Sequence, residues 1–310
     1  MVKFKKDIKP SLRYNAVIFI AGKTGICGFK SYEGVKKRIE RIEKRGETRY
    51  RPPRGMKFRT EFSKEMFGGM DYYIFDGGKS RTGIFFHGGA LIAPPTPFHL
   101  RAADRLASDC HAKIYFPIYP RLPFYNAEKC HGILTDWIKS LPEKEFFFIG
   151  DSAGGGLALS LYDCLLKNGD KIPGRIVAFS PWVDVSMTNM DVYFGECSDK
   201  LINARAMCAF YPFWKGNFKA DNPMCSALNC RSFGETEILI ISGGAEALTK
   251  DIKRFCARHS EDKIIWLEYG NLQHDFPVFP VKERNDPLMK TVDFLNCGYF
   301  DLSGWKKENI

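Results

Sequence analysis

The clearest pattern in the chain is an alternation, beyond residue 80, of short apolar runs with longer amphipathic stretches. The apolar runs have the length typical of buried strands, about 4 to 8 residues. They fall at 82–87, 112–118, 145–150, 175–180, 237–242 and 263–269. Stretches with helical spacing fall near 98–109, 127–140, 153–167, 248–259 and 286–296. Repeated strand–helix units predict an α/β fold, with a mostly parallel central sheet and helices on both of its faces.

The beginning of the chain follows a different pattern, and we predict a basic N-terminal cap segment with its linker at residues 1–57 before a main domain at 58–310. Residues 16–22 (AVIFIAG) predict the buried face of a helix, because the run is of minimal length for a secretory signal and has no A-x-A cleavage site. Residues 31–45 place apolar side chains on one helical stripe among basic ones, which predicts an amphipathic helix. Residues 46–57 contain two prolines and two glycines and predict a linker.

Two further features interrupt or precede the alternation. Strand-like runs at 58–67 and 70–76 flank a Gly-Gly pair, which predicts a β-hairpin. The longest gap between strands is 181–236, rich in aromatics and prolines, with a helix expected near 203–215. Because ligands bind beyond the carboxyl ends of parallel strands, we expect this gap to form a cap insertion at about 185–230 over a pocket.

The net charge of +10 is concentrated in residues 1–60, which hold 18 Lys and Arg against 5 Asp and Glu. The remaining residues hold 28 basic against 31 acidic side chains, so the main domain has no basic excess and we expect no nucleic-acid partner. The basic segment leaves open a weak contact of residues 1–57 with an acidic membrane surface.

The ten cysteines are scattered and form no C-x-x-C pair, which favours reduced thiols in a cytoplasmic protein. No apolar run approaches the roughly 18 to 20 residues that a membrane-spanning helix requires. A homo-oligomer is left open by these observations.

A candidate nucleophile follows the apolar run that ends at Gly150. There the chain reads Gly150-Asp151-Ser152-Ala153-Gly154 and continues as a small-residue helix. The motif G-x-S-x-G between a strand and a helix predicts a strained turn that exposes the serine above the sheet. A glycine-rich phosphate-binding turn or a close-packed helix start is the alternative for this motif considered alone.

The stretch FFHGGA, at the end of an earlier strand, supports the nucleophile interpretation. Glycines there can leave backbone N–H groups directed at a bound substrate, so Gly88, Gly89 and Ala153 are the predicted oxyanion-hole donors. We assign His87 a supporting role, in which its ring holds the loop by a hydrogen bond to the backbone.

A serine nucleophile needs a base, and in this arrangement the base follows the last strand. His274 lies there, in the loop after 263–269, whereas four other histidines fall on or beside predicted helices. The orienting acid is expected after the preceding strand, where Glu246 lies in the loop and Asp251 lies further on, inside a helix. We favour Glu246 over Asp251 for this position.

With these pieces in order, the chain resembles the hormone-sensitive-lipase-like group of α/β-hydrolase esterases. The resemblance covers most of residues 75–280. Its motifs are HGGA (87–90), IYPRLPFYNA (118–127), GDSAGGGLAL (150–159), SPWVD (180–184), SGGAEALTKD (242–251) and YGNLQHDFPVFP (269–280).

The resemblance implies an α/β-hydrolase fold with a helical cap, to which the extension before the sheet, residues 1–55, contributes. It also matches Asp151 and Asp184, to which we assign supporting roles in the backbone scaffold. Two departures stand out: Ala90 replaces the glycine of the usual HGGG, which stiffens the loop, and Glu246 stands where aspartate is commoner.

We therefore expect a serine carboxylic-ester hydrolase that acts on small apolar esters with short acyl chains, such as acetyl or butyryl, through an acyl-enzyme. No metal and no cofactor are implied. The same triad can act on an amide, a lactone or the acetyl group of a sterol or sugar, and these alternatives stay open. A non-catalytic ligand-binding protein on the same fold is a further alternative, against which the presence of His274 argues.

Overall fold

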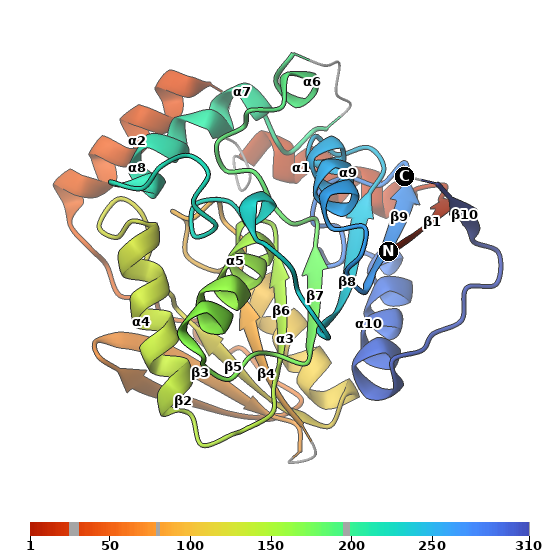
Figure 1. Ribbon diagram of the computed structural model, residues 1–310, viewed down its shortest axis with the longest axis horizontal. Helices are drawn as coiled ribbons and strands as arrows, with labels where there is room; N and C mark the ends of the chain where they lie inside the picture. Colours follow the sequence, from red (N-terminus) through yellow and green to blue (C-terminus); the bar gives the residue numbers. More distant parts are fainter. Residues whose placement is uncertain (25–30, 79–80, 195–198, 310) are drawn as a thin grey trace.

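A computed structural model describes residues 1–24, 31–78, 81–194 and 199–309. Within them, ten strands form one sheet in the order β10-β1-β9-β8-β7-β6-β4-β5-β3-β2 (Figure 1). The strands are β1 (Val2–Asp7), β2 (Glu61–Phe67), β3 (Met70–Asp76), β4 (Arg81–Phe86), β5 (Ala112–Pro117), β6 (Phe147–Asp151), β7 (Arg175–Phe179), β8 (Glu237–Gly243), β9 (Ile264–Gly270) and β10 (Lys306–Glu308).

The sheet is mostly parallel, as the alternating pattern predicted. Strands β4 to β9 and β1 run in one direction, while β2, β3 and β10 pair antiparallel to their neighbours. The β2–β3 pair is the predicted hairpin, with Phe67 opposite Met70 across the Gly-Gly turn. The fold class predicted from the sequence is confirmed.

Helices cover both faces of this sheet. They are α1 (Leu12–Thr24), α2 (Tyr32–Arg45), α3 (Pro97–Asp109), α4 (Ala127–Ser140), α5 (Ala153–Asn168), α6 (Met190–Tyr193), α7 (Ala204–Met207), α8 (Tyr211–Lys215), α9 (Thr249–Arg258) and α10 (Asn285–Cys297). Alternate residues of one strand are buried on opposite faces of the sheet. Ile238 and Ile240 of β8 belong to the core with α4, α5 and α9, whereas Leu239 and Ile241 belong to the core with α3 and α10. This two-sided burial explains why the strands read as continuous apolar runs.

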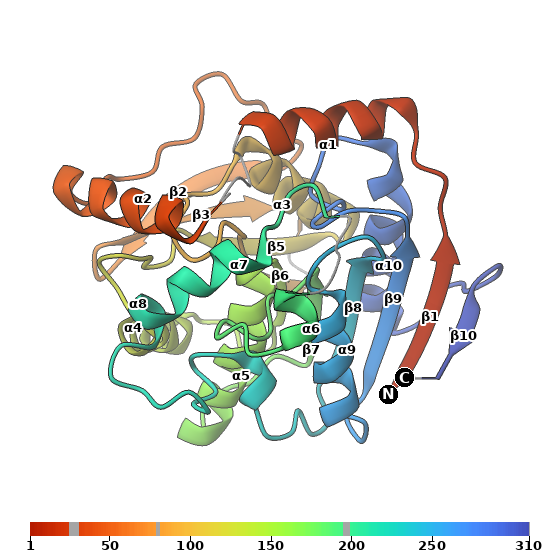
Figure 2. The same ribbon diagram turned by 90° about the horizontal axis from the view of Figure 1, so that it is seen from above.

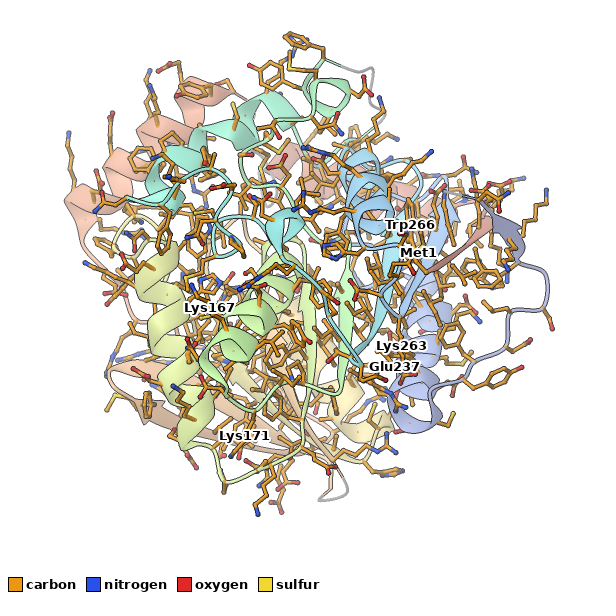
Figure 3. The ribbon with its side chains drawn as sticks, viewed as in Figure 1. Met1, Lys167, Lys171, Glu237, Lys263 and Trp266 are labelled. Atoms are coloured by element: carbon orange, nitrogen blue, oxygen red, sulfur yellow. The ribbon has the colours of Figure 1, made fainter. Side chains whose placement is uncertain are left out.

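Strand β1 was not predicted from the sequence. Its residues are mainly lysines alternating with apolar side chains, and it lies parallel to β9 with Lys3 in register with Trp266. Figure 3 shows Met1, directly before β1, close to Trp266 of β9. Lys3 Nζ lies 2.8 Å from a carboxylate oxygen of Glu268 and 4.4 Å from the centre of the Trp266 ring. Part of the N-terminal segment therefore belongs to the sheet. Its partner strand β9 follows more than 250 residues later in the chain and supplies the Glu268 carboxylate that compensates the charge of Lys3.

The first two helices lie across the carboxyl ends of the strands, and α2 packs beside α7 (Figures 1 and 2). Helix α2 matches its prediction: Ser31 caps it by accepting a bond from Gly34 N, and Val35 and Ile39 are buried. Helix α1 differs from its prediction, because the apolar run 16–22 is not one buried face. Ile18 and Ala21 are buried, whereas Phe19 is 57% exposed and Ile20 56% exposed.

The expected helix near 203–215 is present in three short pieces, α7, a 3-10 turn at Cys208–Phe210 and α8. Phe210 and Trp214 of these pieces are buried. In the part of the chain that the structure describes, no helix combines the length and the apolarity that crossing a bilayer requires.

Candidate active site

The turn between β6 and α5 carries Ser152 in a strained backbone conformation. Its φ of 51° and ψ of −120° are rare for a residue with a side chain, and its hydroxyl stands at the start of α5. Both glycines of the motif are required by close packing. A Cβ at Gly150 would clash with the carbonyl of Gly154, and one at Gly154 would clash with the carbonyl of Phe86. The start of α5 therefore packs so closely against its own turn and against β4 that only glycine fits at these two positions.

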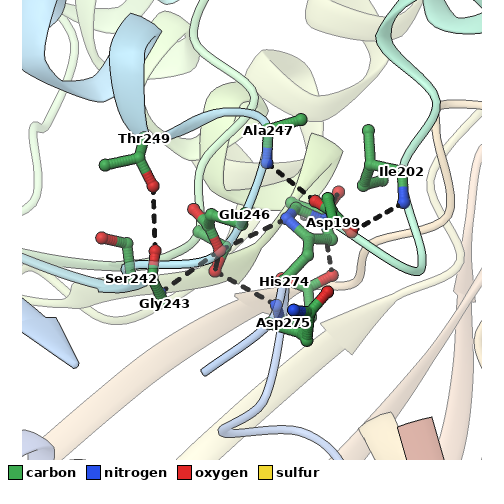
Figure 4. A network of polar contacts seen from close by, with 12 residues as sticks. Asp199, Ile202, Ser242, Gly243, Glu246, Ala247, Thr249, His274 and Asp275 are labelled. Atoms are coloured by element: carbon green, nitrogen blue, oxygen red, sulfur yellow. Dashed lines mark hydrogen bonds and ion pairs between the residues drawn. The ribbon is translucent and has the colours of Figure 1, made fainter. Parts of the chain in front are cut away.

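His274, in the loop after β9, reaches this serine. Its Nε2 lies 2.9 Å from Ser152 Oγ, and both side chains are buried. Its Nδ1 lies 3.6 Å from Glu246 Oε2, an ion-pair distance that is longer than a hydrogen bond (Figure 4). The structure thus brings together the three residues that the sequence analysis had assigned to one triad.

Glu246 follows the end of β8 and is held by backbone and side-chain donors. Its Oε2 accepts hydrogen bonds from Ser180 Oγ at 2.6 Å and from Gly243 N at 3.3 Å. Burial raises the pKa of Glu246, and His274 and Ser180 oppose that rise. The alternative acid, Asp251, instead accepts a hydrogen bond from Asn189 Nδ2 at 2.9 Å.

Asp275 is a member of this cluster that the sequence analysis missed. Its Oδ2 lies 3.1 Å from His274 Nε2, and its backbone N donates to Ser180 Oγ at 3.1 Å. Its φ of 54° turns the chain back on itself, so that adjacent side chains converge. The only sequence signal was an aspartate directly after the histidine, which by itself does not show the direction of the side chain.

The electrostatic balance favours a charged imidazole. Burial lowers the pKa of His274, but the carboxylates of Asp275 and Glu246 outweigh burial and hold that pKa well above its usual value. Burial raises the pKa of Asp275 to about 7, against the attraction of His274. A raised pKa makes the imidazole a stronger proton acceptor, but His274 can take the proton of Ser152 only when its ring is neutral.

The predicted oxyanion loop runs directly behind the nucleophile turn. A Cβ at Gly88 would clash with the carboxylate of Asp151, and Gly89 has a φ of 120°, which side chains avoid. Both positions therefore need glycine for reasons of space and backbone conformation. Ala153 is the first residue of α5, where N–H groups point away from the helix toward a ligand. Ala90 and Leu91 follow with φ of 53° and 62°, so the loop carries two non-glycine residues in the left-handed region.

His87 contacts the loop and not the serine. Its Nδ1 lies 2.6 Å from Gly88 O, and its ring stacks on Tyr119 with 4.4 Å between ring centres. Tyr119 Oη donates a hydrogen bond to the carbonyl of His87 at 2.8 Å. Burial lowers the pKa of His87 well below its usual value, which keeps the ring neutral. These contacts fit the bracing role expected for His87.

Asp151 is held by a histidine that the sequence analysis treated as ordinary. Its Oδ2 lies 3.0 Å from His99 Nε2, and Thr96 N donates to His99 Nδ1 at 2.9 Å. Because Nδ1 accepts a bond, the proton of a neutral His99 is on Nε2 and faces Asp151. His99 thus orients the aspartate that packs against Gly88.

Asp184 stabilises the segment that follows β7. Its oxygens accept hydrogen bonds from the backbone N of Ser186 at 3.0 Å and of Thr188 at 3.1 Å, and Arg254 pairs with it at 3.2 Å. These contacts fit its expected place in the backbone scaffold. Across residues 1–24, 31–78, 81–194 and 199–309, there is no group of His, Cys, Asp and Glu side chains that could hold a metal ion.

Comparisons with known proteins identify the family of the chain. Residues 83–278 match the α/β hydrolase fold family, and this match covers more than half of the chain. An esterase of Acinetobacter venetianus is 25% identical over 210 residues, which are 64% of this chain and 69% of that protein. An acetyl-hydrolase of Streptomyces hygroscopicus is 24% identical over 217 residues, 66% of this chain and 72% of that protein.

A triacylglycerol lipase of Mycobacterium tuberculosis is 26% identical over 172 residues, 54% of this chain, and this match spans 35% of the lipase. Among solved structures, a putative esterase from Staphylococcus aureus has a TM-score of 0.79 at 20% identity, covering 89% of this chain and 98% of that one. A hormone-sensitive lipase from a metagenome library has a TM-score of 0.70 at 20% identity, covering 94% and 99%.

The chain belongs to the α/β hydrolase fold family. The resemblance to α/β-hydrolase esterases, inferred from the motifs, is confirmed by the curated relatives named esterase, acetyl-hydrolase and lipase, and solved structures titled as hormone-sensitive lipases share the fold.

Proposed function

We propose that this chain is a carboxylic-ester hydrolase in which Ser152 is the nucleophile. The observation that carries the proposal is the 2.9 Å contact between Ser152 Oγ and His274 Nε2, at a strained turn above the sheet. Relatives named esterase, acetyl-hydrolase and triacylglycerol lipase support the type of reaction.

The reaction follows from the positions of these groups. His274 removes the proton of Ser152 as its oxygen attacks the ester carbonyl, and Glu246 and Asp275 stabilise the imidazolium that results. The N–H groups of Gly88, Gly89 and Ala153 stabilise the negative oxygen of the tetrahedral intermediate. His274 then returns its proton to the leaving alcohol, and water releases the acid from the serine in a second step.

The proposed substrates are small apolar esters with short acyl chains. Helix α2 and the segment from α7 to α8 form the proposed cap, in which Phe210 and Trp214 are buried, and we expect such bulky side chains to favour a small acyl group. A relative named acetyl-hydrolase supports a small acyl group.

p-Nitrophenyl acetate, butyrate and laurate would test reaction and chain length together. We expect hydrolysis to be fastest with acetate or butyrate and to be abolished in Ser152→Ala. The matched control is Ser260→Ala, which alters an exposed serine outside the proposed site, and we expect it to keep full activity. Residual activity in Ser152→Ala equal to the control would refute the mechanism, and faster hydrolysis of laurate would refute the chain-length preference.

A weak contact with acidic membranes is part of the proposal. Helix α1 exposes Leu12, Phe19 and Ile20 at the carboxyl edge of the sheet, within the basic segment. Cosedimentation with anionic and neutral vesicles tests this contact: we expect binding to anionic vesicles that falls with salt and in Phe19→Ser. Equal sedimentation with neutral vesicles would contradict it.

We also propose a cytoplasmic location and leave the homo-oligomer as a prediction. Eight of the ten cysteines are described, and all eight are free thiols, six of them buried. Light scattering at several concentrations measures the oligomeric state, and a mass equal to one chain at every concentration would rule out a homo-oligomer.

A further inference from the structure

A basic cleft of about 530 Å³ lies between α2 and the segment that follows the oxyanion loop. Arg38, Arg41 and Arg45 line it from α2, and Arg121 lines it from the loop between β5 and α4. The lining also includes Ile92 and Pro94, which follow the predicted oxyanion-hole glycines in the chain. The described lining contains no member of the triad, so this arginine cleft is distinct from the catalytic centre.

The three helical arginines are placed together by the helix itself. Arg38, Arg41 and Arg45 are separated by three and four residues, so they follow one another along a single face of α2. Burial lowers the pKa of Arg38, and the neighbouring charge of Arg41 lowers it further. Like charges held this close repel one another, and a bound anion would relieve that repulsion.

Arg121 supplies a fourth cation with unused hydrogen-bonding capacity. Its Nη1 is buried and has no hydrogen-bond partner among the described residues. It also lines an adjoining hollow of about 250 Å³, together with Tyr50, whose Oη is likewise buried without such a partner. Buried donors without acceptors are costly, which makes this place suited to an anionic ligand.

The lining of the arginine cleft supplies little negative charge. Glu47 is the only acid among the described residues that line the arginine cleft, and its Oε2 already accepts a hydrogen bond from Tyr125 Oη at 3.2 Å. In the described lining, the guanidinium groups of Arg41, Arg45 and Arg121 therefore outnumber the one carboxylate. The cleft differs from an ordinary solvated helix face, because one of its cations, Arg121, has a buried Nη1 atom.

We propose that the arginine cleft binds a phosphoryl group. Planar guanidinium groups donate two parallel hydrogen bonds to phosphate oxygens, and several of them around one site match a multiply charged anion better than a single carboxylate. The phosphoryl group belongs either to a small phosphorylated molecule or to a lipid head group. Its binding beside residues 92–94 would place it next to the oxyanion loop.

Isothermal titration of the full chain with pyrophosphate tests the site. We expect saturable binding, weakened at least tenfold in the double variant Arg41→Gln/Arg45→Gln and in Arg121→Gln. The double variant Lys37→Gln/Lys44→Gln removes the same charge from the same helix outside the cleft, and we expect a change of less than threefold. Absence of saturable binding by the unaltered chain, or an equal loss in the lysine control, would overturn the proposal.

The two sources of the phosphoryl group are separated by a second arm. Vesicles of phosphatidylcholine with and without phosphatidic acid are sedimented with the same variants. Binding that the arginine variants lose and the lysine control keeps supports a lipid head group, whereas pyrophosphate binding without vesicle binding supports a small molecule. Vesicle binding lost equally in both double variants, with no pyrophosphate binding, refutes the site.

The test does not depend on hydrolysis. Ser152→Ala should bind pyrophosphate like the unaltered chain, so loss of activity and loss of anion binding are measured separately. Melting temperatures of the arginine variants, compared without ligand, show that they are folded, and pyrophosphate should raise the melting temperature of the unaltered chain but not theirs.

Discussion

The Nε2 atom of His274 lies 3.1 Å from a carboxylate oxygen of Asp275, its neighbour in the chain. The left-handed φ of Asp275 turns its side chain back toward the imidazole. The same Nε2 lies 2.9 Å from Ser152 Oγ, so one nitrogen faces both the nucleophile and an acid. The proposed base thus has a carboxylate at each ring nitrogen, Asp275 at Nε2 and Glu246 at Nδ1.

This relationship predicts a pH effect. The two carboxylates hold the pKa of His274 well above its usual value of 6.5, and the base must be neutral to act, so activity falls as pH drops through that raised pKa. Asp275→Asn removes one of the carboxylates and lowers the pKa of His274. We expect the acid limb of kcat/KM to move to lower pH by about one unit, as measured with p-nitrophenyl acetate from pH 5 to 9.

The control is Asp286→Asn. Asp286 lies outside the proposed site and accepts a hydrogen bond from Tyr269, so this substitution should leave the acid limb in place. A profile for Asp275→Asn that coincides with the unaltered profile would show that the carboxylate does not act on the imidazole.

The triad acid is tested by a matched pair of substitutions. Glu246→Gln removes the carboxylate that faces His274 Nδ1, and we expect kcat to fall by roughly 10² to 10⁴. Asp251→Asn keeps the oxygen that accepts from Asn189, and we expect kcat to change by less than about threefold. The opposite ranking would assign the role to Asp251.

Asp251 also affects stability. Burial raises its pKa to about 7 from 3.8, so the folded chain retains a proton that the unfolded chain loses, and the free energy of unfolding falls between about pH 4 and 7. Asp251→Asn removes this penalty. We expect its free energy of unfolding at pH 8 to exceed that of the unaltered chain by about 1 to 3 kcal/mol, and the gap to close by pH 4. A gap that is the same at both pH values would mean that Asp251 is ionised throughout.

Ala90 occupies a strained position beside the glycines of the proposed oxyanion hole. Its φ of 53° is costly for alanine and easy for glycine, so Ala90→Gly should raise the free energy of unfolding by about 0.5 to 1 kcal/mol. Ala16→Gly, at an exposed position in α1, should instead lower it by about 1 kcal/mol. Urea unfolding measures both, and destabilisation of similar size in the two variants would contradict the strain.

Gly154 is predicted to be intolerant of a side chain. A Cβ there would clash with the carbonyl of Phe86, so Gly154→Ala should cost about 1 to 3 kcal/mol of stability and displace Ser152. Gly132, exposed on α4 with open space around it, is the control. Gly132→Ala should stabilise the chain by about 0.5 to 1 kcal/mol with unchanged activity, and thermal unfolding with an ester assay distinguishes the two outcomes.

Local patterns were sufficient for much of the fold. The apolar runs of β4 to β9 are buried on both faces, so their boundaries could be predicted without knowing which strands pair with them. The G-x-S-x-G turn could also be predicted, because a strained turn packed against a neighbouring strand admits few residue types. Strand β1 was missed because the charge of Lys3 is compensated by Glu268 and its ammonium group lies over the Trp266 ring, and only the sheet brings these partners near.

By itself, the sequence determined the order of strands and helices, the position of Ser152 and the loop in which His274 lies, because these depend on periodicity and on backbone conformations that few residues adopt. The tertiary structure alone decided which acids face the imidazole. The contacts of Glu246 and Asp275 with His274, and of Asp251 with Asn189, depend on the directions of side chains in separate loops. The arginine cleft has the same origin: α2 supplies three of its charges, but the fourth, Arg121, joins them only because the folded chain packs two distant segments together.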